Sequence, residues 1–553
     1  MYKNKISILL VGIIIFAGFV MAPFLSLDVG AEPKKANTLR FGWNEPFGQK
    51  RLDVFNPGTS SKALLFQLVY SGLVQVNPDG ALINDLAKDW SSTNKGTVYT
   101  FQLKKGVKWH DGEDFTAEDV VFTFHYMLHP DVPQFHSFEG IKGGKQYDNT
   151  DFEKYMDTGE PVLGVTAIDD YTVEFTLRNP SAVFEKVIGT KTFIVPKHIL
   201  KDVSPQEWLD TAYVRGEEML PGTGPFKFYE REPRQYTLLK KNKNYFKGEP
   251  GVEYFKLFPI PNLATQYNSV IGDELDVAKL SEEDVESAET HDDLTVVPLI
   301  RSVVGTLRFN MARHYLSYPE VRKAFLYAID MPALKNSVLK YSGDPWTSPF
   351  KSHYATPEEF IEASEQNKKH YEYNPEKAKQ LLEEAAQKGW DKDHEIVVVT
   401  EAEEAPLHHA LESMWSQVGL NVEIRTGLRN IISKVFEKKD FDVLLSGQIG
   451  SLTPQDLYPW VGCNREYSEG TGFNCENYCN KEVDRLFEKA SATMDKEERG
   501  EIYKEIAKKL KEDAAFNVLW RERLNFAVRN RVKNVKQISA MQYVPYYKWT
   551  LEN

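Results

Sequence analysis

The sequence contains very little cysteine: Cys463, Cys475 and Cys479 are its only three, and they share one short segment. An odd count allows one disulfide and one free thiol in an oxidising compartment, and it leaves open which two cysteines pair. A zinc site would need a fourth ligand, and the nearest histidines, His408 and His409, lie far upstream. The cysteines therefore favour a local disulfide over a metal site.

The chain also lacks an excess of positive charge. Its 67 lysines and arginines stand against 80 aspartates and glutamates, a formal net charge of -13, with no concentrated basic stripe. Binding to nucleic acid needs clustered cations that neutralise phosphates, so a nucleic acid partner is not expected. The glycines of PGTGPF, 221–226, lack the GK[ST] ending of a phosphate loop and lead into a strand, which argues against nucleotide binding.

A long apolar run occurs once, from Ile6 to Leu27, after Lys3 and Lys5. Small residues follow at 29–31, an order typical of a signal peptide, so we expect a mature chain that starts near Glu32. The run is also long enough to cross a bilayer core of about 30 Å, which leaves a membrane anchor over residues 1–31 as the alternative. Both interpretations place the remaining chain outside the cytoplasm, in the periplasm or at the cell surface.

The remaining chain has the composition of a soluble globular protein, with 42% hydrophobic and 27% charged residues. A length of 553 residues exceeds what one hydrophobic core supports, so several domains are expected. Strand patterns such as LRFGW, 39–43, alternate with amphipathic helix patterns, which indicates a mixed α/β protein. Residues 395–426 predict a strand, a helix and a second strand, the unit of a parallel or mixed sheet.

The stretch VKWHDGEDFTAEDVVFTF, 107–124, has one histidine and five carboxylates within ten positions. The alternating Tyr99, Phe101 and Leu103 before it, continued by Val107 and Trp109, predict a hairpin with one buried face. The HDG that follows is turn chemistry, and TAED is a capping box that predicts a helix from residue 117. We interpret these acids as scaffolding for a turn, a cap and a helix dipole.

Several segments, in this order, resemble the family 5 extracellular solute-binding proteins, the peptide receptors of ABC importers. The longest of these segments is YTFQLKKGVKWHDGEDFTAEDVVFTF, 99–124. The others are FNP (55–57), GLVQVNPDGALINDLAKDWS (72–91), PGTGPFKF (221–228), LRFN (307–310), VRKAFLYAID (321–330), NPEKAKQLLEEA (374–385) and NKEVDRLFEKA (480–490).

The resemblance implies an α/β, two-lobed periplasmic-binding-protein-like fold of the class II, or cluster C, type, with three domains and a hinged cleft. Domain I would combine residues 37–75, 208–299 and 520–553. Domain II would be an insertion at 76–207, and domain III would span 300–519. Such a monomer would bind an elongated polar solute between its lobes and deliver it to a membrane permease, without cofactor, metal or catalytic residues.

Peptide receptors of this family commonly hold the ligand's amino terminus with an aspartate, in a segment that reads FDVLLSGQIGSLTPQDLYPW here, 441–460. That aspartate would fall near Gly450 or Ser451, so a neutral ligand such as a small oligosaccharide fits better, because an unpaired buried ammonium costs several kcal/mol. A shifted alignment would bring Asp442 or Asp456 to this position and would again favour a short peptide. Both ligand classes, short peptide and small oligosaccharide, therefore stay open. Aromatic, amide and hydroxyl groups suited to such ligands are Trp43, Asn44, Ser446, Gln448 and Trp460.

Two other functions compete with this interpretation. A secreted hydrolase would need paired carboxylates, for which only the acid-rich EAEEA at 401–405 stands out, and catalytic pairs normally come from separate elements. A metal or metallophore receptor would show clustered histidines, whereas the 12 histidines form no dense cluster, and a pair such as His408 and Glu412 lacks a third ligand. A binding protein is therefore the interpretation that the sequence favours.

Overall fold

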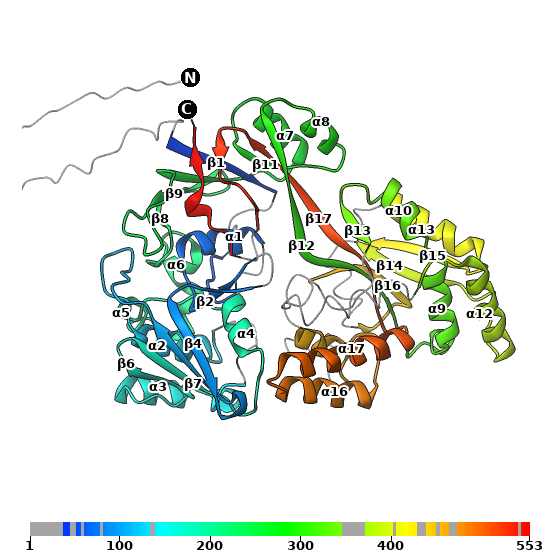
Figure 1. The fold of residues 1–553 in the computed structure, drawn as a ribbon, viewed down its shortest axis with the longest axis horizontal. Coiled ribbons are helices and arrows are strands. Elements are labelled where there is room, and N and C mark those ends of the chain that lie inside the picture. The colour runs from blue at the N-terminus through cyan, green and yellow to red at the C-terminus, as the bar shows by residue number, and fades with distance from the viewer. Residues whose placement is uncertain are drawn as a thin grey trace, which may run out of the picture.

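The computed structural model describes residues 37–44, 51–56, 60–77, 81–132, 138, 140–345, 371–401, 405–427, 438–449, 454–463, 473–539 and 543–552. They form two groups of elements, named here the left half and the right half after Figure 1. Two long antiparallel strands, β12 (Leu294–Phe309) and β17 (Phe516–Arg529), pass from one half to the other. Within the described ranges, no helix has both the length and the apolar character that crossing a membrane requires.

One large sheet runs through both halves in the order β15-β14-β16-β12-β17-β11-β1-β10-β9-β8, with β13 beside β17. The left half contributes β1 (Thr38–Trp43), β8 (Phe226–Glu232), β9 (Tyr236–Lys241), β10 (Tyr254–Pro259) and β11 (Val277–Lys279). The right half contributes β13 (Gly343–Pro345), β14 (Ile396–Glu401), β15 (Val422–Gly427) and β16 (Val443–Ile449). Every residue of β1 is buried, which confirms the strand predicted there.

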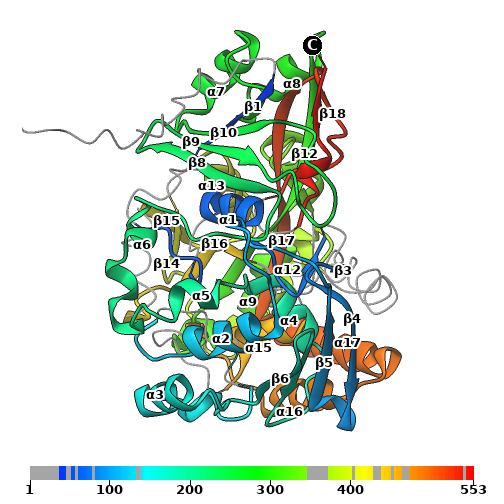
Figure 2. The ribbon, with the colours of Figure 1, turned by 90° about the vertical axis from the view of Figure 1, so that its left-hand side faces the viewer.

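A second sheet, β4-β5-β7-β6, lies in the lower part of the left half (Figure 2). Its strands are β4 (Ala87–Thr93), β5 (Val98–Leu103), β6 (Val165–Asp169) and β7 (Thr172–Thr176). The buried face predicted for Tyr99, Phe101 and Leu103 is confirmed. The predicted hairpin is wrong: β4 and β7 occupy both edges of β5, so Val107 and Trp109 turn into the core and only Lys108 forms a bridge, with Asp114.

Short helices surround the strands of the left half. They are α1 (Ser60–Val69), α2 (Ala117–Met127), α3 (Asn149–Thr158), α4 (Phe184–Lys191), α5 (Lys197–Leu200), α6 (Ala212–Arg215), α7 (Leu263–Ile271) and α8 (Val285–Glu289). Helix α2 begins at residue 117 behind the Thr116 and Asp119 capping box, as predicted. The apolar run LLFQLVYSGLV, 64–74, has the pattern of a helix, but α1 extends only to Val69 and the small strands β2 (Val74–Val76) and β3 (Leu82–Asn84) follow.

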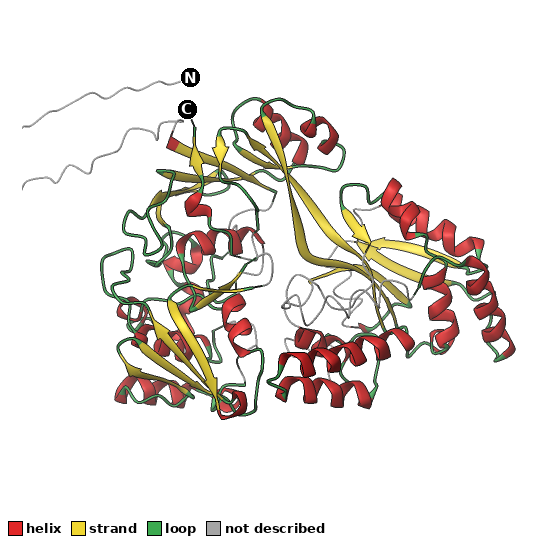
Figure 3. Cartoon of the chain, in the orientation of Figure 1, coloured by secondary structure: helices red, strands yellow, loops and turns green. Residues whose placement is uncertain are grey.

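In the right half, helices lie beside the sheet formed by β14, β15 and β16, and a further helix pair lies below it (Figure 3). They are α9 (Pro319–Tyr327), α10 (Met331–Ser337), α12 (Pro375–Gln387), α13 (Ala405–Gln417), α15 (Tyr458–Val461), α16 (Lys481–Ala492) and α17 (Lys496–Glu512). Strands β14 and β15 are parallel and joined through α13, which confirms the predicted unit. The segment YPEVRKAFLYAIDMPAL, 318–334, has the pattern of one amphipathic helix, but it forms parts of two, because the Asp330 side chain accepts from Ala333 N and starts a new helix.

The two halves have separate hydrophobic cores. A large cluster in the left half joins residues of the first strands, of the region around α2 and of the C-terminal segment, among them Phe41, Phe124 and Trp549. Clusters in the right half centre on Phe325 and Trp415 and on Phe487 and Ile506. Because β12 and β17 contribute to the clusters on both sides, they hold the two halves together.

Candidate functional site

The passage of β12 and β17 between the halves is marked by a break in their pairing. The ladder runs from Leu294 to Ile300, shifts its register, and resumes from Val304. At the restart, Gly305 lies so close to Trp520 that an added Cβ would meet the indole ring at 2.1 Å. Such an interruption bends the strands and increases their local twist, and this region is here named the crossing.

Strand β13 supports the crossing from the side. It pairs with Trp520–Glu522 of β17, and its Asp344 carboxylate accepts from Arg523 Nη2 at 2.8 Å and Lys335 Nζ at 3.1 Å. These cations hold the pKa of Asp344 low against the effect of its partial burial. The carboxylate therefore acts as an anchor that fixes β13 to β17.

Trp43 and Asn44 lie at the carboxyl end of β1. Trp43 is buried, and its ring stacks on Phe526 of β17 with centroids 5.6 Å apart. Its indole Nε1 has no hydrogen-bond partner among the residues that the structure describes. Asn44 follows in a bend and is half-buried. Trp43 thus combines a packing role with an unused donor.

Ser446 and Gln448 lie on β16, on the right-half side of the crossing. Ser446 is buried opposite Thr306 of β12, whose hydroxyl donates to its carbonyl at 3.0 Å. Gln448 pairs in register with Val304, where the β12–β17 ladder resumes. Gly447, between them, would bring an added Cβ within 3.1 Å of Glu522 Oε1. This part of β16 therefore faces the crossing.

Trp460 lies on α15 and is partly buried. It stacks on Phe473, with centroids 4.6 Å apart, and the Arg308 guanidinium lies over its ring at 4.9 Å. Arg308 is itself buried, pairs with Glu476 and donates to Phe473 O at 3.0 Å. The Trp460 ring is therefore held between an aromatic side chain and a cation.

The segment that contains the three cysteines lies next to the Arg308–Glu476 pair. A disulfide joins Cys463 and Cys479, and Cys475 is the buried free thiol. Burial raises the pKa of Cys475 to about 12, so the thiol stays neutral beside Arg308. Sequence reasoning missed Arg308 and Glu476. The one signal in the sequence was the position of Arg308, a charged residue in a strand between Leu307 and Phe309, which are both fully buried.

Asp442 is one of the two acids that would restore an amine-binding group. Its carboxylate accepts from Val397 N at 2.9 Å and from the Tyr315 hydroxyl, and Arg313 Nε lies 3.3 Å away. The second acid, Asp456, lies in a short turn before α15. Gly450 and Ser451, where the aspartate of peptide receptors would align, lie outside the described residues. Asp442 is thus engaged in holding β14, β16 and the segment after β12 together.

The acid-rich stretch around His110 is structural, as the sequence indicated. His110 Nδ1 accepts from Gly222 N at 3.1 Å, and its Nε2 lies 3.0 Å from Gly224 O. Burial lowers the pKa of His110 to about 4, so the ring is neutral at ordinary pH. Asp119 caps α2 and also accepts from Lys197 N at 3.0 Å. These residues fasten the 107–124 stretch to the PGTGPF turn and to α5.

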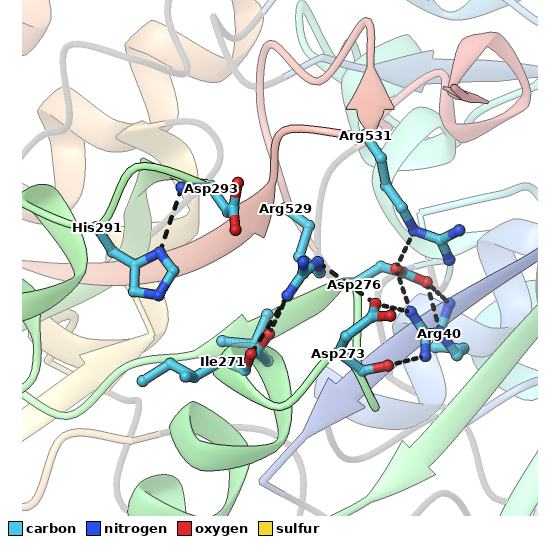
Figure 4. Close-up of polar contacts among 9 residues, drawn as sticks. Arg40, Ile271, Asp273, Asp276, His291, Asp293, Arg529 and Arg531 are labelled. Carbon is cyan, nitrogen blue, oxygen red and sulfur yellow. Dashed lines mark hydrogen bonds and ion pairs between the residues drawn. The ribbon is translucent and has the colours of Figure 1, made fainter. Parts of the chain in front are cut away.

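A second charged cluster holds the left half together (Figure 4). Asp276, fully buried on the segment that enters β11, accepts from Arg40 Nε at 3.0 Å and Arg531 Nε at 2.7 Å. Arg529 Nη1 donates to Val270 O at 2.8 Å, and Asp273 pairs with Arg40 at 2.9 Å. The cluster joins β1, β11 and the end of β17, and its pairing within the protein indicates a structural role.

The described residues contain no group of three or more His, Cys, Asp or Glu side chains placed to hold a metal ion. His408 is buried on α13, and its Nε2 lies 3.1 Å from Thr400 Oγ1. It is therefore part of the packing between α13 and β14. The EAEEA segment, apart from its two ends, lies outside the described residues.

This architecture is that of the two-lobed extracellular solute-binding proteins. The fold is similar to a substrate-binding protein of an ABC transporter, CtaP from Listeria monocytogenes, with a TM-score of 0.75 and 23% identity over 94% of this chain and 100% of that chain. It is also similar to the oligopeptide-binding protein AppA from Bacillus subtilis in complex with a nonapeptide, with a TM-score of 0.72, 22% identity, and coverage of 94% and 100%.

Sequence comparison defines the family. The model of the bacterial extracellular solute-binding proteins, family 5 (middle), matches residues 81–468. Bacillus subtilis AppA is 25% identical over 503 residues, 88% of this chain and 86% of that protein. The dipeptide-binding protein of Escherichia coli is 25% identical over 499 residues, with coverage of 87% and 88%. The chain belongs to the family 5 bacterial extracellular solute-binding proteins.

Proposed function

We propose that the protein is the substrate-binding component of an ABC importer and that it captures a short peptide outside the cytoplasm. The single observation that carries this proposal is the pair of long strands that joins two separately packed halves through an interrupted ladder. The names of the similar proteins, which include an oligopeptide-binding and a dipeptide-binding protein, support a peptide as the ligand.

The mechanism follows from linkage. A solute that contacts both halves binds the closed arrangement more tightly than an open one, and it shifts the equilibrium by no more than that difference in affinity. The interrupted ladder at the crossing would absorb the change in backbone angles, while the two cores move as bodies. The closed, loaded protein would then dock on the permease, which releases the solute unchanged.

The domain division proposed for this mechanism places 37–75, 208–299 and 520–553 in domain I, 76–207 in domain II and 300–519 in domain III. Two observations support it. The boundaries at 299/300 and 519/520 fall at the crossing, where the β12–β17 ladder is interrupted. The strands β4, β5, β6 and β7, all within residues 87–176, form a sheet of their own, separate from the large one.

For the ligand-binding surface we propose Trp43, Asn44, Ser446, Gln448 and Trp460. The positions of Ser446 and Gln448 beside the crossing support this set, as does the unpartnered indole donor of Trp43. An aromatic ring and its N–H can grip an apolar surface and a polar group of one ligand. Trp460, held between Phe473 and Arg308, would offer a rigid ring from the right half.

A small neutral oligosaccharide is the second candidate ligand. It is favoured by the engagement of Asp442, which leaves this carboxylate tied to Val397, Tyr315 and Arg313 rather than offered to an ammonium group. A buried ammonium without a counter-charge costs several kcal/mol, whereas sugar hydroxyls need only amide and hydroxyl partners.

A binding panel tests these proposals. The protein is incubated with a library of short peptides and with a set of small neutral oligosaccharides, and its thermal unfolding is followed. A true ligand at 100 times its Kd stabilises the folded protein by about 2.7 kcal/mol. Stabilisation by peptides alone supports the first candidate, and stabilisation by sugars alone supports the second. Mass spectrometry of the recovered ligand completes the test, because a cleaved ligand would identify the protein as a secreted hydrolase.

A further inference from the structure

The two halves also touch at a second place, far from the crossing. In Figures 1 and 2 the helices α16 and α17 of the right half lie beside the lower end of the β4–β5 sheet and α4 of the left half. The residues involved are 491–499, which comprise the end of α16, the connection to α17 and the first turn of α17. We name this segment the latch turn.

A backbone hydrogen bond joins the latch turn to the left half. Ala182 N, just before α4, donates to Ser491 O at 3.1 Å. Ser181 N, its neighbour, donates to Gly96 O at 3.0 Å, so the receiving segment is fixed within its own half. The donor and acceptor of the first bond lie 309 positions apart in the chain, and no covalent neighbour forces them together.

A side-chain contact accompanies this bond. Gly96 has φ +82, and a Cβ there would lie 2.4 Å from Met494 Sδ and 3.1 Å from its Cε. The thioether therefore rests directly on the bare backbone of the opposite half. Methionine is suited to such a contact, because its unbranched, polarisable side chain fits irregular surfaces and exchanges easily.

Charge complements this contact. Glu185 lies in the first turn of α4, and its Oε2 is buried without a hydrogen-bond partner among the described residues. Burial raises the pKa of Glu185, while Lys186 of its own helix and Arg499 and Lys496 of the latch turn lower it. Tyr99 of β5, which packs on Phe184 at 5.1 Å, borders the same carboxylate. Arg499 also shapes the turn, since its Nη1 donates to Thr493 O at 2.8 Å.

We propose that the latch turn is a lobe-to-lobe latch: it holds the two halves closed from the side opposite the crossing and thereby sets the affinity for the ligand. The proposal rests on the proposed function, because a latch has a role only in a clamp that opens. Its residues would change affinity without contact with the ligand, since apparent affinity scales with the fraction of protein in the binding-competent, closed form.

Paired cysteines test the geometry without any ligand. In the Ala182→Cys/Ser491→Cys protein the two thiols stand at positions whose backbones are hydrogen-bonded to each other. We expect a disulfide to form between them in the ligand-free protein under mild oxidation, detected as the loss of two reactive thiols and as a peptide cross-link. Failure of the pair to cross-link, in a protein that unfolds cooperatively like the wild type, would overturn the latch.

A charge swap tests the energetic role. Glu185→Lys places a cation against Lys496 and Arg499, so we expect a larger radius of gyration by small-angle scattering and about fivefold weaker binding of a ligand from the panel. Adding Lys496→Glu should recover part of both changes. Glu505→Lys serves as control: it makes the same change of charge at an exposed residue of α17 outside the latch turn, and should leave both quantities unchanged.

The outcomes separate the two proposals. If Glu185→Lys and Glu505→Lys scatter alike, the latch is wrong even when ligands bind and close the protein. If no ligand is found but the scattering of the ligand-free variants changes as expected, the latch stands as a contact between the halves and the proposed solute capture fails.

Discussion

At the scale of single residues, the protein buries several charged side chains, and each of them needs an opposite charge or hydrogen-bond donors or acceptors beside it. Arg308 and Glu476 form such a pair in the right half, and Asp276 collects two arginines in the left half. The buried Asp53 is held mainly by uncharged donors: its carboxylate accepts from Phe55 N and Trp208 Nε1, both at 3.0 Å. The charge of Lys62 lowers the pKa of Asp53. Burial dominates and raises its pKa to about 6.

The raised pKa of Asp53 predicts how stability depends on pH. The folded protein binds this proton more tightly than the unfolded chain, so the contribution of Asp53 to stability grows as pH falls from 7 towards the unfolded pKa of 3.8. Between pH 7 and pH 5 the gain should be about 1 kcal/mol. In Asp53→Asn the gain should be absent, because the amide does not titrate. Urea unfolding of both proteins at the two pH values measures the difference, and equal pH responses would contradict the assignment.

The buried pair in the right half predicts a large effect of removing one charge. Glu476→Gln leaves the Arg308 guanidinium buried beside a neutral thiol, so the free energy of unfolding should fall by about 3 kcal/mol. Glu482→Gln is the matched control, since Glu482 pairs with Arg485 at 2.6 Å on the surface. Its cost should stay below about 1 kcal/mol. Equal losses in the two variants, measured by urea unfolding, would mean that the buried pair has no special weight.

At the scale of elements, close approaches of backbone decide which segments can pack. The PGTGPF turn lies against the end of α1: a Cβ on Gly222 would meet Val69 O at 1.8 Å, and a Cβ on Gly224 would meet Val69 C at 2.5 Å. The same turn donates Gly222 N to His110. Glycine is required here because another backbone occupies the space of the side chain.

Gly222→Ala should therefore be strongly destabilising. The methyl group has to displace the main chain of α1, which should cost about 2 kcal/mol or more of unfolding free energy. Gly140→Ala is the control, because no heavy atom lies within 4 Å of an added Cβ there. Thermal or urea unfolding of both variants gives the comparison. A Gly222→Ala protein as stable as Gly140→Ala would show that α1 and the turn are not in contact in solution.

The elements also show what the sequence can and cannot predict. The capping box at Thr116, the cap at Asn374 and the parallel β14–β15 unit were predictable, because their signals lie within a few residues of each other. The hairpin after Leu103 was mispredicted, since alternation reveals a buried face but not which strands occupy the neighbouring edges. The Cys463–Cys479 pairing, the contact of His110 with Gly222 and the latch turn depend on packing between distant segments, which no local pattern encodes.

At the scale of the whole molecule, the decisive feature is that two cores share one sheet. The left-half cluster and the right-half clusters share no residue among those described, and strands β12 and β17 contribute residues to both. Bodies joined so narrowly tend to unfold separately unless something couples them. The latch contact is small, so in the ligand-free protein it adds little to that coupling. A ligand gripped by both halves would add much more.

Calorimetry of the ligand-free protein should therefore resolve two unfolding transitions. The variants Gly222→Ala and Glu476→Gln show which transition belongs to which half. Gly222→Ala should lower only the transition of the left half, and Glu476→Gln only that of the right half. A saturating ligand from the binding panel stabilises whichever half would unfold first and should merge the transitions, because losing either half releases it. A single transition that both variants shift equally without ligand would show that the halves already unfold as one unit, and the hinged clamp would then lose its physical basis.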